Sequence, residues 1–340
     1  MKFGIGIPNC REGIFYPIPF AGTHEILKLT QLAERLGYDS VWGTDFICPV
    51  PAMSLPEPQT PNWYEPLISL AYLAGATQRI ELGVGVVLLP YRDPVILAKQ
   101  AVTLDQFSGG RLLFGWGLGH FRDEFVAIQT RNKRARRGEV LEENMEALHL
   151  LLNSDGKVSF KGKYFEFRDV ELDPKPFQKP LPVYIAGHAP DTPARIARYA
   201  AGMSMVFSAV KGSIREMVDA LVPYLEREGR DLSEIDRAFS TNLFLAQTRE
   251  EAVKGAKESW LTKRRGARDP DAFIARLLVG TPEEVAEKIR NLEEQGVTHC
   301  VTTNFLVDTF DEALEQVQMF GEEVLPLYSS VSGKEQSYNT

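Results

Sequence analysis

His120 is the side chain with the clearest catalytic potential in this sequence. It follows a glycine-rich run, residues 115–119, that ends a predicted strand. Imidazole is the side chain whose ordinary pKa lies near neutrality, so a histidine at a strand end is suited to proton transfer. The glycines before it lack side chains, and we expect a flat ligand to lie against the backbone there. A structural or ring-stacking histidine is the alternative.

The turn formed by Gly187, His188 and Ala189 is a second candidate. It lies between the apolar run of residues 183–186 and a predicted helix over residues 192–201. The first N–H groups of a helix have no partner within the helix, and together with the helix dipole they attract phosphate. The turn therefore predicts a phosphate site. The alternative is an ordinary strand-to-helix turn capped by Asp191.

Four aromatic residues are candidates for the wall of an apolar substrate pocket: Phe46, Trp63, Trp116 and Phe121. Ligand pockets are mostly apolar, and these rings would hold an aromatic or aliphatic substrate. Core packing is the alternative for each of them. The sequence contains no metalloprotease, P-loop, nucleophile-elbow or zinc-ligand motif, and we expect no bound metal.

Bringing these residues together requires a fold in which strand ends meet. Eight strand-like runs alternate with helical segments, which is typical of parallel β/α folds, and we predict a (β/α)8 TIM barrel with loop insertions. In that fold the active site lies at the carboxyl ends of the strands. The predicted strands are residues 2–8, 39–43, 80–88, 112–116, 183–186, 204–207, 239–245 and 299–304.

A doubly wound sheet of the Rossmann type is the competing fold. It also alternates strands with helices and collects glycines at strand ends. Its fingerprint, G-x-G-x-x-G, belongs to a first strand. Here Gly115, Gly117 and Gly119 lie on the fourth strand with the spacing G-x-G-x-G, which favours the barrel.

Three segments interrupt the alternation of strands and helices. They are a proline-rich loop over residues 48–62, a β-hairpin region over residues 154–179 and a charged excursion over residues 262–280. Long insertions of this kind are commonly lids or binding loops. We expect the first and the last of them to determine substrate selectivity.

The sequence resembles the bacterial luciferase-like oxidoreductases, a superfamily of (β/α)8 barrels. Four motifs in the family's order carry the resemblance: TQRIELGVGVVLLPYRDPVILAKQ, SGGRLLFGWGLG, YFEFRDVELDPKPFQ and PVYIAG. The likeness extends from about residue 2 to about residue 327. It implies an oxidoreductase that uses reduced FMN or the deazaflavin coenzyme F-420, with the ring system performing the redox step.

The resemblance also implies where the cofactor is bound. Gly85 and Val86 match the position of a non-proline cis peptide in many members, and the Gly187 turn matches the position of the cofactor's phosphate. Asp45 and Asp123 match polar contacts in deazaflavin-dependent members. The full set of implied contacts is Asp45, Gly85, Val86, Gly119, Asp123, Ala186, Gly187, His188 and Ala189.

Two positions depart from the family's pattern. Several relatives carry a histidine where this chain has Phe46, and deazaflavin-dependent alcohol and sugar-phosphate dehydrogenases carry a glutamate where it has His120. The acid/base pair of those dehydrogenases is therefore missing. This argues against alcohol oxidation of that kind and leaves His120 as the expected proton-transfer group.

Both cofactors remain open at this point. With FMN, the enzyme would oxygenate a small organic substrate and depend on a separate NAD(P)H-dependent flavin reductase; with F-420, it would transfer hydride. The deazaflavin's anionic tail would need cationic groups, for which Arg92, Arg122 and the basic run over residues 131–137 are candidates. The alternatives are a non-catalytic flavin-binding barrel and a Rossmann-type NAD(P) dehydrogenase.

Composition sets further bounds. The chain has 340 residues, 44% of them hydrophobic, and a formal net charge of −8, so we expect one large core and neither nucleic acid nor membrane as a partner. Cys10, Cys48 and Cys300 match neither a disulfide framework nor a zinc site, and they indicate a cytoplasmic protein. We expect one domain over residues 1–328, a disordered tail over residues 329–340 and, from the resemblance, a homodimer.

Overall fold

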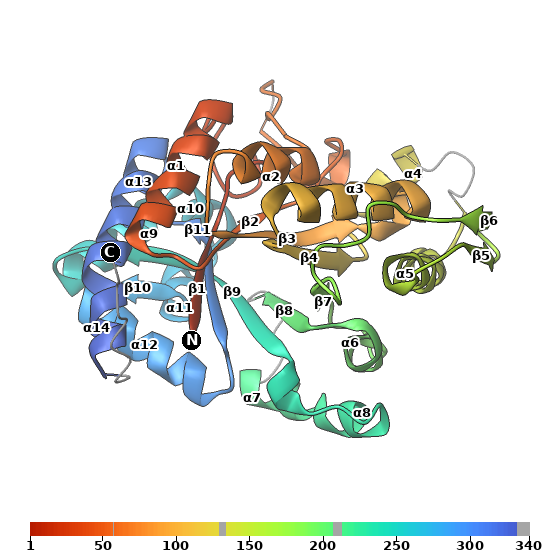
Figure 1. Cartoon of the computed structure of the whole chain (residues 1–340). Helices are drawn as coiled ribbons and strands as arrows, with labels where there is room; N and C mark the ends of the chain where they lie inside the picture. The colour runs from red at the N-terminus through yellow and green to blue at the C-terminus, as the bar shows by residue number, and fades with distance from the viewer. Residues whose placement is uncertain (57, 129–133, 207–212, 332–340) are drawn as a thin grey trace.

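Eight parallel strands form a closed barrel in the computed structural model, which describes residues 1–56, 58–128, 134–206 and 213–331 (Figure 1). Neighbouring strands follow the order β1-β2-β3-β4-β7-β8-β9-β11, and β11 pairs with β1 to close the ring. The predicted fold and its eight strands are confirmed, although Phe207 lies outside the described residues. The strands are β1 (Lys2–Gly6), β2 (Ser40–Gly43), β3 (Glu81–Leu88), β4 (Leu112–Gly117), β7 (Val183–Ala186), β8 (Gly202–Val206), β9 (Asp236–Leu245) and β11 (His299–Phe305).

Helices surround the barrel on its outside (Figure 1). Among the described residues, no helix is both long enough and apolar enough to cross a membrane. The last helix ends at Val331, within the tail for which disorder was expected from residue 329. Residues 332–340 lie outside the described part. The main helices are α1 (Thr23–Leu36), α2 (Pro66–Ala74), α3 (Pro94–Ser108), α4 (Arg122–Ile128), α5 (Arg137–Asn153), α6 (Thr192–Tyr199), α7 (Ile214–Asp219), α8 (Val222–Arg227), α9 (Arg249–Glu258), α12 (Pro282–Glu294), α13 (Phe310–Met319) and α14 (Leu325–Val331).

Capping residues fix where several of these helices begin. Thr248, Thr281 and Thr309 precede α9, α12 and α13, and each exchanges hydrogen bonds with a glutamate three residues later. Such a capping box satisfies two N–H groups that the helix leaves without a partner. At α3, Asp93 caps the first turn, and Pro94 occupies the first helical position, where its missing N–H does no harm.

Two of the three insertions contain helices or strands. The excursion over residues 262–280 includes the end of α10 (Trp260–Arg265), α11 (Pro270–Ala275) and β10 (Leu278–Gly280). β10 pairs with the last three residues of β9, a strand of ten residues. The predicted hairpin is confirmed as β5 (Val158–Lys161) and β6 (Glu166–Val170), which pair in antiparallel fashion.

Side chains fill the amino-terminal part of the barrel interior. They are Trp42, Leu113, Tyr184, Ala238 and Val301. Glycines make room for the two largest of them: a Cβ on Gly83 would lie 2.4 Å from Trp42 Cδ2, and one on Gly202 would lie 2.3 Å from Tyr184 Cε1. A bound cofactor must therefore lie above this layer, towards the carboxyl ends of the strands.

β3 carries the cis peptide bond predicted between Gly85 and Val86. The register between β3 and β4 shifts at this point. A Cβ on Gly117 would lie 2.1 Å from Val86 Cγ2, and one on Gly115 would lie 2.0 Å from the carbonyl oxygen of Val84. Gly115 and Gly117 thus accommodate β3, and contact of a flat ligand with the glycine backbone of β4 stays a prediction.

Candidate active site

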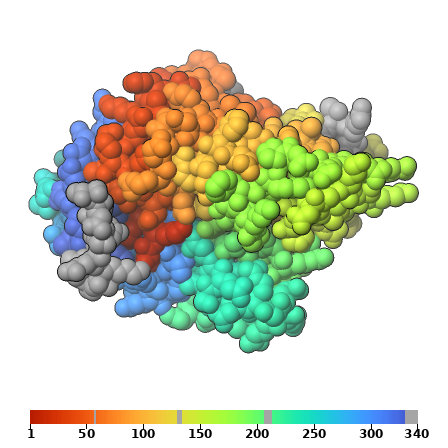
Figure 2. Space-filling model, viewed as in Figure 1, coloured from red at the N-terminus to blue at the C-terminus, as the bar shows by residue number. Residues whose placement is uncertain are grey.

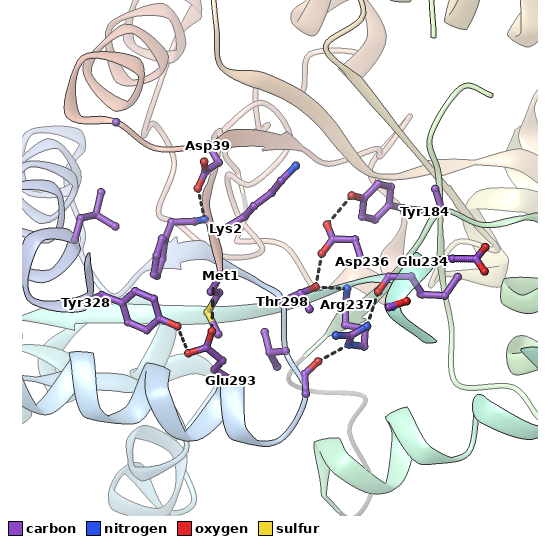
Figure 3. A pocket seen from close by; sticks show the side chains of 18 of the residues that line it. Met1, Lys2, Asp39, Tyr184, Glu234, Asp236, Arg237, Glu293, Thr298 and Tyr328 are labelled. Carbon is purple, nitrogen blue, oxygen red and sulfur yellow. Dashed lines mark hydrogen bonds and ion pairs between the residues drawn. The ribbon is translucent and has the colours of Figure 1, made fainter. Parts of the chain in front are cut away.

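A cavity of about 1110 Å³ lies at the amino-terminal end of the barrel (Figure 3). Its polar groups bond to one another and to the backbone. Asp236 accepts hydrogen bonds from Tyr184 and Thr298 and contacts His299, while Arg237 donates to three backbone carbonyls. These contacts hold strand ends together. The chemistry of such barrels lies at the opposite end.

At that opposite end, Asp45 and Arg92 form a buried ion pair. Arg92 Nη2 lies 2.9 Å from Asp45 Oδ2, and the Leu88 N–H donates to the same oxygen at 2.9 Å. Glu65 lies 3.0 Å from Arg92 Nη2. Burial lowers the pKa of Arg92, but the two carboxylates outweigh it and the net shift is upward. Two carboxylates already neutralise Arg92; its contact with an anionic cofactor tail and the cofactor contact of Asp45 stay predictions.

Glu124, which the sequence did not single out, is the buried carboxyl group of α4. Its Oε1 accepts hydrogen bonds from the N–H groups of Ile47 at 2.7 Å and Cys48 at 3.4 Å, whereas Oε2 is buried without a hydrogen-bond partner among the described residues. Burial raises the pKa of Glu124 and the charge of Asp45 adds to this. Asp123, the predicted contact, is exposed beside it. No sequence signal separates the two neighbours, because the start of α4 was not predicted.

We expect Glu124→Gln to change how stability depends on pH. A carboxyl group with a raised pKa binds its proton more tightly in the folded state, so the wild-type protein loses stability as the pH rises above about 4.5 through the raised pKa. Glutamine accepts the same two hydrogen bonds without titrating. Calorimetry should show the melting temperature of the variant rising relative to wild type with increasing pH. The exposed Asp123→Asn should show no such trend, and a constant difference for Glu124→Gln would contradict the assignment.

Three of the predicted pocket residues form a row of rings beside His120. The ring of Phe46 lies 5.3 Å from that of Trp63 and 6.2 Å from that of Phe121. His120 meets Phe121 edge-on at 4.7 Å. The loops after β2 and β4 therefore bring an apolar wall and an imidazole together.

Trp116 is not part of that row. It is 1% exposed and packs edge-on against Phe114 in the main hydrophobic core. Successive strand residues point to opposite faces, and Leu113 belongs to the layer inside the barrel. Trp116, three residues later, points outward to the helices, so its predicted place in the substrate pocket is wrong.

Positively charged groups from several segments surround His120. Burial lowers the pKa of His120, and the charges of Arg265, Arg137 and His188 lower it further. Arg137 also donates to the Gly119 carbonyl at 3.1 Å. A histidine with a lowered pKa is mostly neutral at pH 7 and can accept a proton. The same charges give the mouth a positive potential suited to an anionic group.

The turn before α6 has a backbone that favours glycine. Gly187 has a φ of +156°, and a Cβ there would lie 2.9 Å from Thr192 Oγ1. Gly187, His188 and Ala189 are exposed, and the Thr192 N–H donates to the Ala189 carbonyl at 2.9 Å. The side chain of Asp191 caps no N–H group within the described part of α6, so the alternative of an Asp191-capped turn is wrong.

The predicted cofactor contacts fall into two groups. Eight lie at or next to the carboxyl ends of β2, β3, β4 and β7, and Asp123 lies on the exposed side of α4. Among the described residues, no cluster of three His, Cys, Asp or Glu side chains could hold a metal ion. The eight are Asp45, Gly85, Val86, Gly119, Ala186, Gly187, His188 and Ala189.

Arg11, in the segment after β1, was also not predicted as a site residue from the sequence. It is 2% exposed, and burial lowers its pKa to about 10, so the guanidinium stays protonated at neutral pH. Its Nη1 donates to Asn304 Oδ1 at 2.6 Å. The only signal in the sequence was a charged residue just beyond a strand end.

Comparison with known proteins finds luciferase-like oxidoreductases that use FMN or F420. The model of the luciferase-like monooxygenase family matches residues 1–299. The chain is 29% identical to an FMNH2-dependent dimethylsulfone monooxygenase of Pseudomonas putida, over 96% of this chain and 95% of that protein. It is 28% identical to an F420-dependent glucose-6-phosphate dehydrogenase of Amycolatopsis mediterranei, over 90% and 94%. A monooxygenase structure from Streptomyces bottropensis matches with a TM-score of 0.78 and 26% identity, over 96% and 100%.

Proposed function

The chain belongs to the luciferase-like monooxygenase family, and we propose that it binds reduced FMN in the barrel mouth and oxygenates a small organic substrate. The observation that carries the proposal is the row of Phe46, Phe121 and Trp63 beside His120. This mouth offers an apolar wall and an imidazole. It lacks the histidine and glutamate pair that the resemblance associates with deazaflavin-dependent dehydrogenases.

The residues at the mouth fit the phosphate of FMN. The Gly187 turn has no side chain where a Cβ would reach Thr192 Oγ1, and it precedes the N-terminus of α6. Backbone N–H groups of this turn would hold the phosphate. Arg137, whose charge lowers the pKa of His120, contributes positive charge to the mouth.

Each remaining group has a distinct task in this proposal. When bound, the reduced ring supplies the electrons that activate O2. The aromatic row excludes water and holds the apolar part of the substrate. Neutral His120 accepts a proton at a ring nitrogen during turnover. As in the FMNH2-dependent relative, reduced cofactor would come from another protein, and we propose an NAD(P)H-dependent flavin reductase. The three cysteines are free thiols, which supports a cytoplasmic location.

Hydride transfer with F-420 is the second candidate. The identity with an F420-dependent dehydrogenase favours it, as does the motif over residues 119–125. One of the cationic groups expected for the anionic tail argues against it, because Arg92 is paired with Asp45 and Glu65. Residues 131–133 of the basic run lie outside the described part. A barrel that binds flavin without turnover would show oxygen uptake with no oxidised substrate.

We propose that two copies associate through α2 and α3. Figure 2 shows these helices next to each other at the surface, in the orange and yellow part of the colour bar. Their outer faces carry Ile68, Tyr72, Ile96 and Phe107, each more than half exposed. Large apolar side chains gathered on a surface commonly mark an interface, and homodimers bury the same patch on both copies.

The double variant Ile68→Lys and Ile96→Lys should therefore be monomeric, because it would bury four like charges in a symmetric dimer. Sedimentation velocity of the wild type and the variant measures this directly. Val126→Lys, which changes another exposed apolar residue, should leave the dimer intact. A monomeric wild type, or a double variant that still dimerises, would rule out this interface.

A further inference from the structure

A set of hydrogen-bond donors lies inside the barrel mouth on the side formed by β9, β11 and β1. These three strands are neighbours in the sheet. Arg11 is at the centre: its Nε donates to the Ile7 carbonyl at 3.0 Å and its Nη1 donates to Asn304 Oδ1 at 2.6 Å. Its Nη2 lies 3.0 Å from where a Cβ on Gly6 would be. The absence of a side chain on Gly6 thus gives the guanidinium its space.

The charge of Arg11 dictates the orientation of its neighbours. A guanidinium can only donate, so it fixes the carbonyl of Asn304 towards itself. The amino group of Asn304 then donates to Asn242 Oδ1 at 2.9 Å. This leaves the amino group of Asn242 as a donor with no partner among the described residues. The chain of contacts therefore presents N–H groups, and no acceptor, at its free end.

Arg11 has no anionic partner within the described part of the chain. It contacts neutral groups: a backbone carbonyl, an amide and the ring of Phe15, whose centroid lies 5.5 Å from Arg11 Cζ. Arginine is rarely buried unless paired, because an unpaired buried charge is strongly unfavourable. A second guanidinium, that of Arg265 in α10, lies 4.8 Å from the same ring.

We propose that Arg11, Asn242 and Arg265 bind an oxyanion, a carboxylate or sulfonate group carried by the substrate. The substrate of the monooxygenase is then an organic anion whose apolar part lies against Phe46 and Trp63. This inference rests on the proposed function. The site is distinct from the phosphate site: in the ring of eight strands, β1 and β7 are separated by three strands in either direction. Arg11 therefore lies across the mouth from the phosphate site, and Asn242 on β9 lies between the two.

The test uses methanesulfonate and its neutral isostere dimethyl sulfone as probes. Each is titrated by calorimetry into the cofactor-free protein at constant ionic strength. We expect the sulfonate to bind and the sulfone to bind at least ~10-fold more weakly, as a hydrogen-bonded charge pair implies. Asn304→Asp, which has nearly the same shape, places a carboxylate beside Arg11 Nη1. It should weaken methanesulfonate binding at least ~10-fold and raise the melting temperature.

Two further variants make the outcome decisive. Asn153→Asp at the end of α5 adds the same charge at an exposed position and should leave binding unchanged, whereas Arg11→Met should lose it. Equal binding of sulfonate and sulfone, no binding of either, or full binding of methanesulfonate by Asn304→Asp would overturn the proposal. Reduced FMN is titrated in parallel. Failure of FMN to bind would reject the proposed function and leave the oxyanion result standing on its own.

Discussion

Ala189→Asp is expected to weaken binding of reduced FMN by ~100-fold or more. Ala189 is exposed in the turn before α6, where the phosphate is proposed to bind. Two like charges about 4 Å apart repel by roughly 4 kcal/mol near a protein surface, and screening by salt reduces this. The remaining repulsion still exceeds the roughly 2.7 kcal/mol that corresponds to 100-fold.

Ala189→Asn is the matched control, because it has the same size as aspartate and no charge. It should bind reduced FMN nearly as well as the wild type. Position 187 is less suitable for this test, since any side chain there meets Thr192 and requires an unfavourable φ. Equal affinities of the Asp and Asn variants, measured by anaerobic fluorescence titration, would place the phosphate elsewhere.

His120→Gln should reduce turnover by ~100-fold while changing the affinity for reduced FMN by no more than about threefold. Glutamine keeps a polar group next to Phe121 but cannot transfer a proton. His24→Gln, which changes an exposed histidine of α1, should leave turnover unchanged.

The dependence of turnover on pH tests the role of His120 independently. Burial and the neighbouring cations lower the pKa of His120 below 6.5, so a rate that needs neutral imidazole should rise with pH through a value below 6.5 and level off. His120→Gln should remove that rise. Loss of FMN affinity in the variant, with turnover at saturation preserved, would assign His120 to cofactor binding instead.

The barrel could be predicted because its signals are local. The spacing of apolar residues alternates between that of a strand and that of a helix, and turns and caps separate these segments, as at Thr281 before α12. Each of these signals depends on residues within a few positions of one another. The cis peptide at Gly85 was predicted from the family resemblance, because no local signal marks it.

The candidate site was only partly predictable because its contacts join distant parts of the chain. Arg92 looked available for an anion until Asp45, 47 residues earlier, proved to be its partner. Arg11 and Asn304 are 293 residues apart. The position of Trp116 was predicted wrongly for a different reason. Its strand packs against helices on one face and against the barrel interior on the other, so both faces are apolar. No alternation of polar and apolar residues therefore shows which side chains point inward.

The measurement that tests the central claim most directly is an anaerobic titration of the wild-type protein with reduced FMN and, separately, with coenzyme F-420. Tryptophan fluorescence is a suitable signal, because Trp42 lies directly below Gly85, where a Cβ would be 3.3 Å from its ring, and Trp63 lies in the aromatic row. We expect reduced FMN to bind with a Kd of roughly micromolar size and F-420 to bind at least ~10-fold more weakly. Binding of F-420 alone would replace oxygenation with hydride transfer, and binding of neither would contradict the account.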